Sequence, residues 1–499
     1  MAITTSFTLA RFNWSVAAIT CIEIFETGLI MFASGQIMAG VGLSPEDFAM
    51  SYTLYGVASI FMLYKHKWFV ERLGYRNFVL LSLLFFAVGS IICAISKDIL
   101  LFVVGRILVG VGGATFFTAG RIMINDLPVE HRFNAIIWFV LSFLGFITIA
   151  PILAAILLRF FDYSAIFWIC IPLCLISAVI AYPCLNNTIT PEKQRSQDTW
   201  GWLIWFVLAL CGVQYTIHEI PAEINSPHGQ TFFIAIASII CLILFTLDEW
   251  KKELPVIDYK SLFHARYIFG LLLYFFGYFI SGALAFLLPI LFKEALGLSL
   301  LTTSLVLSLS FFMTLIGALA HIYLTKRGFK QRPFLFIGVI LFFAGCIMFS
   351  QTPKLYNWEW LLIAVFCSGL GCAIYMGPVA FGTFTEVKEN AFSHSYQVKN
   401  IVRQLGFSTS IAMATAVLQI VYLQQSKVAT DIFYPPWKEV IIGLTRSGEA
   451  LGSLPLLEAC SYVFLVLAIS TIPLFLLLIK QKIFILEERL IMNFPMGMM

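Results

Sequence analysis

Long apolar runs separated by short polar segments fill almost the whole chain. A helix needs about 20 residues to cross the roughly 30 Å hydrocarbon layer of a bilayer, because each residue advances about 1.5 Å. Only helices satisfy their own backbone polar groups within a single segment of this kind. The pattern predicts fourteen membrane-spanning helices, at 13–36, 47–66, 77–96, 99–122, 134–158, 164–184, 200–217, 231–249, 268–292, 299–324, 333–351, 359–385, 401–424 and 458–480.

The composition agrees with a chain that lies mostly in lipid. Hydrophobic residues make up 60% of the 499 residues and charged residues only 12%, whereas a soluble domain carries about 25% charge. The net charge of +4 leaves no basic surface of the kind that binds nucleic acid. We therefore predict an all-α, multi-pass membrane protein that has a bilayer, and no nucleic acid, as its partner.

The distribution of Lys and Arg gives an orientation, because loops on the cytoplasmic side carry an excess of these residues. If the N-terminus is cytoplasmic, most of the 31 Lys and Arg residues fall in cytoplasmic loops or at the ends of spans, and Arg106 alone lies more than three residues inside a predicted span. An even number of spans then returns the C-terminus to the same side. We expect a bacterial cytoplasmic (inner) membrane protein with both termini cytoplasmic.

A short turn occurs twice and suggests two equivalent halves. The first copy joins spans two and three and contains Glu71, Arg72, Gly74 and Arg76; the second, at 325–330, joins spans ten and eleven. Each places a glycine, which can adopt the backbone angles of a tight turn, between two cations. Many secondary transporters are built from such repeats. We expect a six-helix bundle at 1–185, an inserted helix pair with linkers at 186–266, and a six-helix bundle at 267–499 with a long outer loop at 425–457.

Ionisable residues inside predicted spans point to the functional centre, since each costs about 2.5–3.5 kcal/mol at the middle of a membrane helix. Glu23 and Glu26 share one helix face at a spacing of three residues. Two carboxylates this close in a low-dielectric cavity do not both ionise easily. We expect Glu23, Glu26 and Arg106 to couple proton movement to transport. The alternative is that the carboxylates pair with a buried cation and have only a structural role.

Two weaker signals accompany these charges. Gly145 and Pro151 make span five small-faced and bendable, which favours a hinge or a close helix contact as much as simple packing. Several aromatic residues could line a cavity for lipophilic or cationic ligands: Tyr52, Tyr55, Trp138 and Tyr278. The cysteines and histidines show no metal-binding spacing, so we expect neither a metal nor a cofactor.

Taken together, these motifs resemble the major facilitator superfamily, and specifically its 14-helix drug:proton antiporter branch. Glu26 occupies the acidic position of that branch's first span, and Glu71–Arg76 is similar to the superfamily's loop signature. The segment around Arg106 resembles the span-four motif with an arginine implicated in proton transfer, and 145–155 resembles the antiporter motif of span five. Arg403 and Gly406, opening span thirteen, match a turn typical of the branch.

The chain also departs from the branch pattern. Glu71 replaces an aspartate in the loop signature, and alanines at 154 and 155 replace the glycine pair that ends the antiporter motif. The resemblance implies a fold of two six-helix bundles with two additional helices. It leaves the cargo and the direction of transport open.

The favoured hypothesis is a proton-coupled secondary transporter that exports a small amphiphilic molecule, either drug-like or a secreted metabolite. The alternatives are uptake, a siderophore-type transporter of the same fold, or a transporter-like receptor or scaffold. A membrane enzyme would need a cluster of His, Asp or Ser at a membrane face, and we find none in the sequence. A periplasmic adaptor is conceivable as a partner, although no motif indicates one.

Overall fold

The structure is a computed structural model, and it describes residues 6–480 except 126, 186, 198–199, 226–228, 353–356 and 430–453. Twelve of its helices are long and apolar enough to cross a membrane. They are α1 (Ser6–Phe32), α4 (Tyr75–Ile95), α5 (Ile99–Asn125), α6 (Val129–Phe160), α9 (Trp200–Asn225), α10 (Gln230–Lys251), α12 (Ala265–Pro289), α13 (Leu300–Lys326), α14 (Gln331–Ser350), α15 (Trp358–Thr383), α16 (Phe392–Ala429) and α18 (Leu454–Lys480).

Two further predicted spans are also helical but depart from a plain apolar helix. Span two is α3 (Pro45–Leu73), which carries charged residues near both ends and none in between, at 48–64. Span six consists of α7 (Ala165–Trp168) and α8 (Cys170–Ala181), a short apolar pair. The prediction of an all-α fold is therefore confirmed, and all fourteen predicted spans are helical, twelve of them in helices long and apolar enough to cross a membrane. Short elements complete the described chain: α2 (Ser34–Val41), η1 (Glu192–Gln194), α11 (Tyr259–Leu262), η2 (Ile290–Ala295) and η3 (Glu389–Ala391).

One predicted boundary was wrong in an important way. Span thirteen was expected to begin at 401, but α16 begins at Phe392 and includes Lys399 and Arg403. Both side chains are buried, although the prediction left Lys399 in a loop and put Arg403 at the very start of the span. Arg106 is therefore not the only cation within a span. The hydrophobic pattern began the span after Lys399, yet the helix begins earlier, because other helices cover its charged residues.

Local sequence signals explain how several helices begin and turn. Ser44 and Asp47 form a capping box at the start of α3, in which each side chain accepts a hydrogen bond from the other residue's backbone N–H at 3.0 Å. The two repeated turns both place their glycine at positive φ, 76° for Gly74 and 82° for Gly328. This confirms the backbone role predicted for the glycines of the internal repeat.

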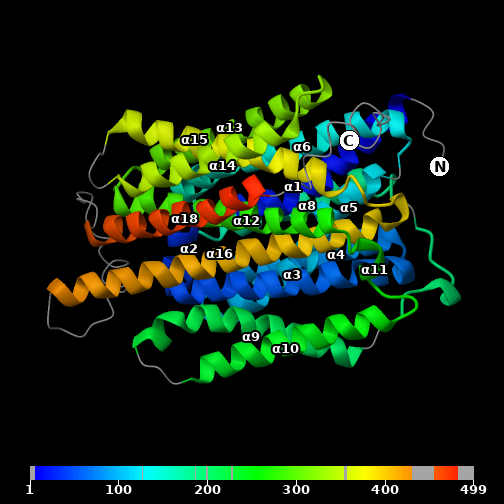
Figure 1. The fold of residues 1–499 in the computed structure, drawn as a ribbon, viewed down its shortest axis with the longest axis horizontal. Coiled ribbons are helices and arrows are strands. Elements are labelled where there is room, and N and C mark those ends of the chain that lie inside the picture. The colour runs from blue at the N-terminus through cyan, green and yellow to red at the C-terminus, as the bar shows by residue number, and fades with distance from the viewer. Residues whose placement is uncertain are drawn as a thin grey trace.

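The helices form two sets that pack against each other (Figure 1). We call α1–α8 the first helix set and α12–α18 the second helix set. Within the first set α5 packs on α1, α3 and α4, and within the second α15 packs on α12, α13 and α14. Between the sets, α6 packs on α13, α3 on α16 and α1 on α12. The predicted domain boundaries agree with these contacts but stay a prediction.

The inserted pair, α9 and α10, lies to one side of both sets (Figure 1). The two helices pack on each other, and α9 also contacts α3 of the first set and α16 of the second. Polar contacts join α9 to both helix sets. His218 shares a hydrogen bond of 3.0 Å with the Thr53 hydroxyl, and the Gln214 amide donates to the Ser408 hydroxyl at 3.1 Å.

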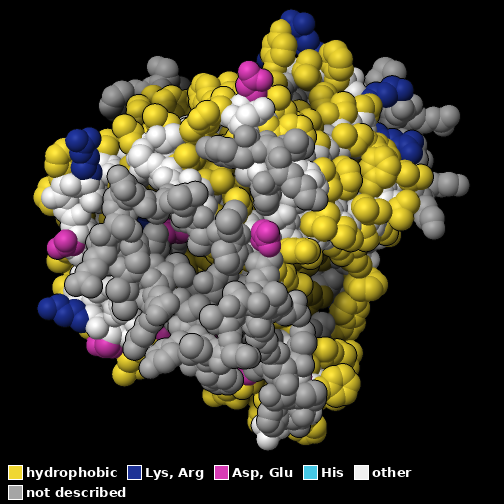
Figure 2. Space-filling model, turned by 90° about the vertical axis from the view of Figure 1, so that its left-hand side faces the viewer, with side chains coloured by type: hydrophobic (Ala, Val, Ile, Leu, Met, Phe, Trp, Pro, Cys, Tyr) yellow, Lys and Arg dark blue, Asp and Glu magenta, His cyan; other side chains and the backbone are white. Residues whose placement is uncertain are grey.

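The two ends of the bundle differ, and we name them by their elements. The linker end carries α11 and the connection at 187–197, and the α2 end carries α2 (Figure 1) and η2, whose Glu294 lies beside Gly35. Figure 2 looks onto the α2 end, and hydrophobic side chains cover the flank at the right of that view. Large apolar side chains such as Leu100, Val179 and Phe233 are more than two-thirds exposed. Such a surface is expected where lipid rather than water surrounds the molecule.

Candidate functional site

Glu23 and Glu26 lie in the C-terminal half of α1, which the other helices enclose. Their exposed fractions are 2% and 0%, so neither carboxylate has access to bulk water. The helix reaches this central position because small residues let its neighbours approach. A methyl group added at Gly28 would lie only 2.8 Å from the Ala150 Cβ of α6.

Glu26 forms an ion pair with Arg106 of α5, within the first helix set. Arg106 is 1% exposed, and its guanidinium carbon lies 4.5 Å from the ring centroid of Tyr55 and 5.7 Å from that of Tyr52. The contact joins a single guanidinium nitrogen to a single carboxylate oxygen. The other carboxylate oxygen and the other terminal nitrogen have no hydrogen-bond partner among the described residues.

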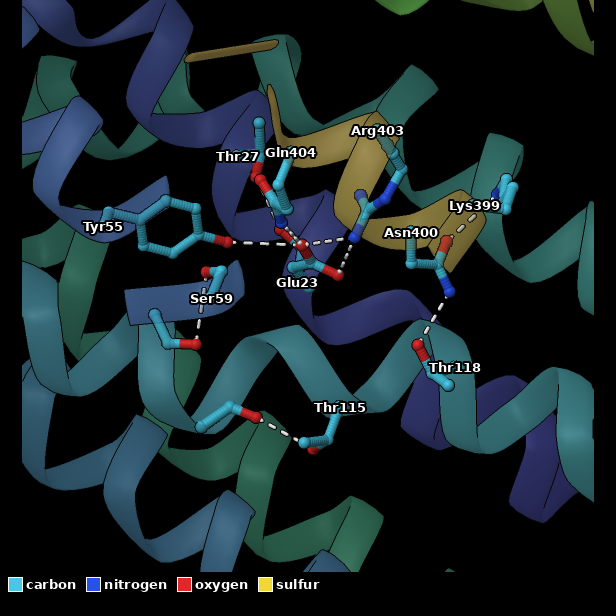
Figure 3. Close-up of polar contacts among 12 residues, drawn as sticks. Glu23, Thr27, Tyr55, Ser59, Thr115, Thr118, Lys399, Asn400, Arg403 and Gln404 are labelled. Atoms are coloured by element: carbon cyan, nitrogen blue, oxygen red, sulfur yellow. Dashed lines mark hydrogen bonds and ion pairs between the residues drawn. The ribbon is translucent and has the colours of Figure 1, made fainter. Parts of the chain in front are cut away.

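Glu23 forms a second pair, and this one crosses between the two helix sets (Figure 3). Arg403 of α16 donates to both carboxylate oxygens of Glu23, at 2.8 and 2.9 Å. The Gln404 amide donates to the same carboxylate at 2.8 Å, and the Tyr55 hydroxyl donates at 3.3 Å. Glu23 is thus surrounded by donors from α3 and α16, whereas Glu26 has a single donor.

A further polar group lies beside this pair on α16 (Figure 3). The Lys399 ammonium donates to the Asn400 side-chain oxygen at 3.1 Å, and the Asn400 amide donates to the Thr118 hydroxyl of α5 at 2.7 Å. Asn400 therefore provides a second polar link between the two helix sets. All three side chains are buried.

The sequence profile of the Major Facilitator Superfamily matches residues 16–411, which include both ion pairs. The chain belongs to the Major Facilitator Superfamily.

Curated relatives from this superfamily are distant but cover most of the chain. Multidrug resistance protein 3 of Bacillus subtilis (strain 168) is 23% identical over 394 residues, covering 78% of this chain and 75% of that protein. The putative multidrug resistance protein MdtD of Escherichia coli O157:H7 is 23% identical, with 85% and 90% covered. The riboflavin transporter RibZ of Clostridioides difficile (strain 630) is also 23% identical, with 84% and 92% covered.

Solved structures show the same fold. A D-xylose-proton symporter superposes with a TM-score of 0.63 at 14% identity, covering 95% of this chain and 97% of that one. The xylose transporter XylE from E. coli, in a partially occluded inward-open conformation, gives a TM-score of 0.57 at 12% identity, with 92% and 96% covered. These comparisons confirm the predicted resemblance to the superfamily and its transporter fold.

The residues that resemble the superfamily's loop signature, Glu71–Arg76, bind the connection between spans six and seven. The Glu71 carboxylate accepts hydrogen bonds of 2.7 Å from both the backbone N–H and the hydroxyl of Ser196. Arg72 donates to the Ser196 carbonyl at 3.1 Å, and Arg76 donates to the Leu185 carbonyl at 3.0 Å. Glycine is needed at position 74 for two reasons. Its φ is positive, and a Cβ there would collide with Asn187. These residues therefore fasten the connection between spans six and seven to the linker end.

The predicted small-residue motifs have different surroundings. A Cβ at Gly406 would lie 3.0 Å from the Phe275 carbonyl oxygen, so this glycine lets α16 approach α12 closely. A Cβ at Gly145 would meet no atom within 4 Å, so this glycine is not needed for close packing. Pro151 is buried within α6. The hinge role predicted for span five stays a prediction.

Of the four aromatic residues predicted to line a cavity, three lie near buried charges and one does not. Tyr52 and Tyr55 border the Glu26–Arg106 pair, and Tyr278 stacks on Tyr274 with ring centroids 5.8 Å apart. Trp138 instead pairs with the exposed Trp14, at 5.0 Å. The described contacts thus place three of the four near the buried charges and Trp138 elsewhere.

Sequence reasoning named Arg403 only as part of a motif and did not connect it with Glu23. It also overlooked Lys399. The spacing of four residues between these two cations places both on one face of a helix, directly before an apolar run. That spacing is the signal that could have indicated a buried basic face on α16. Among the described residues, no cluster of His, Cys, Asp or Glu is arranged to hold a metal ion.

Proposed function

We propose that the chain is a proton-coupled secondary transporter that moves a small amphiphilic molecule by alternating access, with Glu23 binding the coupling proton. The observation that supports this most directly is the contact of Glu23 with Arg403 and Gln404. It joins α1 of one helix set to α16 of the other. Because alternating access moves the two sets relative to each other, the pair is placed where protonation and movement affect the same contact.

Protonation of Glu23 would change the strength of this contact. Hydrogen bonds between two charged groups are roughly twice as strong as neutral ones, so a neutral Glu23 would hold Arg403 less tightly. The two helix sets would then rock more easily. Their contacts toward the ends would also have to break in turn: Arg132 with Glu389, at 3.0 Å, and Gln419 with Glu46, at 2.6 Å.

Glu26 and Arg106 have a supporting role in this proposal. Both belong to the first helix set, so their pair moves with that set as a unit. The pair fixes α1 against α5 and keeps Glu23 facing α16. It also places a positive charge one turn from Glu23. We therefore assign the coupling site to Glu23 with Arg403, supported by Glu26 and Arg106.

The direction of transport follows from different observations. The relatives named for multidrug resistance favour export as the first direction to test, and uptake by proton symport is the second. The proposed location is a bacterial cytoplasmic membrane with the linker end in the cytoplasm. Glu71, Arg72 and Arg76 lie at this end, in agreement with an excess of basic residues in cytoplasmic loops.

The test is substrate-dependent proton movement in proteoliposomes that contain the purified chain and an internal pH-sensitive dye. Ethidium, riboflavin and 2-naphthaleneacetate would be offered under pH gradients of both signs. We expect at least one compound to move protons, and the sign of the proton movement relative to that of the compound gives antiport or symport. Glu23→Gln should lower this flux at least about tenfold.

The matched control is Glu359→Gln, which neutralises an exposed glutamate in the first turn of α15. This variant should transport like the original protein. Equal proton flux in the Glu23→Gln variant and the original protein would rule out Glu23 as the coupling group. A receptor or scaffold would instead show no proton movement with any compound and would tolerate substitution of Glu23.

A further inference from the structure

Lys399 is buried in an aromatic enclosure without a carboxylate of its own. The side chain is 2% exposed, and its Nζ lies within 5.4 Å of four ring centroids. The rings come from three helices: Phe117 of α5 at 4.6 Å, Tyr396 of α16 at 4.9 Å, and Tyr274 and Tyr278 of α12 at 5.1 and 5.4 Å. These helices belong to both sets, so the enclosure lies between the sets.

The charges around this enclosure are mostly positive. Arg403 and Arg121 are the neighbouring cations, and Glu23 is the neighbouring anion. Glu23 already binds Arg403 through both of its oxygens. Arg121 contacts the rings of Phe392 and Tyr396, at 5.1 and 6.0 Å, and no carboxylate among the described residues pairs with it.

The hydrogen bonds of Lys399 are also incomplete. An ammonium group carries three N–H donors, and the structure gives Lys399 one acceptor, the Asn400 side-chain oxygen at 3.1 Å. Cation–π contacts offset part of the cost of burying a charge, but a buried cation is normally paired with an anion. The Lys399 ammonium therefore has two donors available, within a set of rings and beside two arginines.

We propose that this enclosure binds the cargo, and that the cargo is an organic anion with a carboxylate, sulfonate or phosphate group on a flat aromatic body. The anionic group binds Lys399 with help from Arg121, and the aromatic body packs among Tyr274, Tyr278 and Phe117. This inference rests on the proposed transport function and specifies its substrate class. It replaces the lipophilic or cationic ligands expected from the aromatic residues alone.

Glu23 then links cargo and proton electrostatically. As the carboxylate beside Lys399 and Arg403, it repels an incoming anion. Its neutralisation leaves Arg403 without its anionic partner and makes the enclosure more positive. An anion therefore binds more tightly when Glu23 is neutral, which favours movement of the proton and the anion in the same direction, the symport named above as the second direction to test.

The first test measures binding to the purified full chain in lipid nanodiscs by isothermal titration calorimetry. The probes are 2-naphthaleneacetate and its cationic counterpart 2-naphthylmethylammonium, which share one ring system and differ in charge. We expect the anion to bind at least about tenfold more tightly than the cation, since a charge-assisted hydrogen bond contributes on this scale. Equal binding of both probes, tighter binding of the cation, or binding of neither would overturn the inference.

Variants then locate the site. Lys399→Gln should weaken binding of the anion at least about tenfold, and Lys399→Arg should retain most of it. The matched control is Lys388→Gln, which removes an exposed lysine at the linker end, and its binding should equal that of the original protein. Thermal unfolding of each variant shows whether it is folded, and Arg121→Gln, with an expected several-fold weakening, provides a second measurement if Lys399→Gln fails to fold.

Glu23→Gln tests the electrostatic link and should tighten binding of the anion several-fold. Weaker or unchanged binding in this variant would contradict the link. The two proposals fail differently. Proton-coupled transport of the cationic probe alone would overturn the anionic cargo and keep the transport function. Anion binding at Lys399 without any proton movement would keep the binding site and overturn proton coupling.

Discussion

The two carboxylates of α1 lie one helical turn apart and are both buried, yet their surroundings differ. Glu26 pairs with Arg106 inside the first helix set and has one donor. Glu23 pairs with Arg403 across the two sets and also accepts from Gln404 and Tyr55. A pair within one rigid group can persist through a conformational cycle, whereas a pair between two moving groups cannot. In the proposed mechanism, the location of each pair relative to the two helix sets, more than its burial, separates the supporting pair from the coupling pair.

The Glu26–Arg106 pair should have the larger effect on stability. In Arg106→Met, Glu26 remains buried without its partner, and we expect the free energy of unfolding to fall by about 3–5 kcal/mol. The measurement is thermal unfolding of the purified protein in detergent. The double variant with Glu26→Gln should recover most of the loss, because no uncompensated charge remains. A small loss in Arg106→Met would mean that this pair does not hold α1 against α5.

The Glu23–Arg403 pair should instead control transport. Glu23→Arg and Arg403→Glu each place like charges in contact, and each should reduce proton-coupled flux by about 30-fold, equivalent to about 2 kcal/mol. Exchanging both residues restores an attractive pair and should recover part of the flux. Proteoliposome transport is the measurement. If the double exchange is no more active than the single variants, contact between these two side chains is not what matters.

Gly110 lies where α5 meets α3. It is beside Tyr55, which contacts Glu23 of one ion pair and Arg106 of the other. A Cβ at Gly110 would lie 2.6 Å from the carbonyl oxygen of Tyr55. Gly110→Ala should therefore destabilise the protein by about 1–2 kcal/mol through overpacking, as measured by thermal unfolding. Gly145→Ala is the matched control, because its Cβ would meet open space, and it should be neutral or slightly stabilising. Equal effects of the two substitutions would contradict this packing.

A substitution at Tyr55 has the smallest expected effect and still distinguishes the two ion pairs. Tyr55→Phe removes the hydroxyl that donates to Glu23 at 3.3 Å but keeps the ring beside Arg106. We expect a loss of about 0.5–1 kcal/mol in stability, the usual range for one hydrogen bond between membrane helices, and a larger relative change in proton flux. A change in stability alone would assign the hydroxyl to packing rather than to Glu23.

The hydrophobic pattern was sufficient to predict the fold. Each span in a membrane must be long, apolar and helical, so the spans could be found from the sequence without any tertiary contact. The repeated turn could be found in the same way, because the requirement for glycine at Gly74 and Gly328 is local. The buried charges of Glu23, Glu26 and Arg106 stood out because charge is rare inside spans.

The partner of Glu23 could not be predicted in the same way. Glu23 and Arg403 are 380 positions apart in the chain, and their contact depends on how α1 and α16 pack. The start of α16 was also missed, because Lys399 and Arg403 lower the hydrophobicity by which a span is recognised. A pattern that identifies lipid-facing helices is least informative for a helix such as α16, in which buried cations lie at the start of the apolar run.

The position of α9 has a mechanical consequence. The helix touches α3 through His218 and α16 through Gln214, so it lies across the seam between the two helix sets. Any sliding of α3 past α16 must shear one of these contacts. Gln214 also donates to the neighbouring Thr409 hydroxyl at 3.2 Å, so its amide can pass between two adjacent acceptors as α16 shifts. If the two helix sets move relative to each other as proposed, the contacts of α9 with both sets would guide that movement and limit its extent.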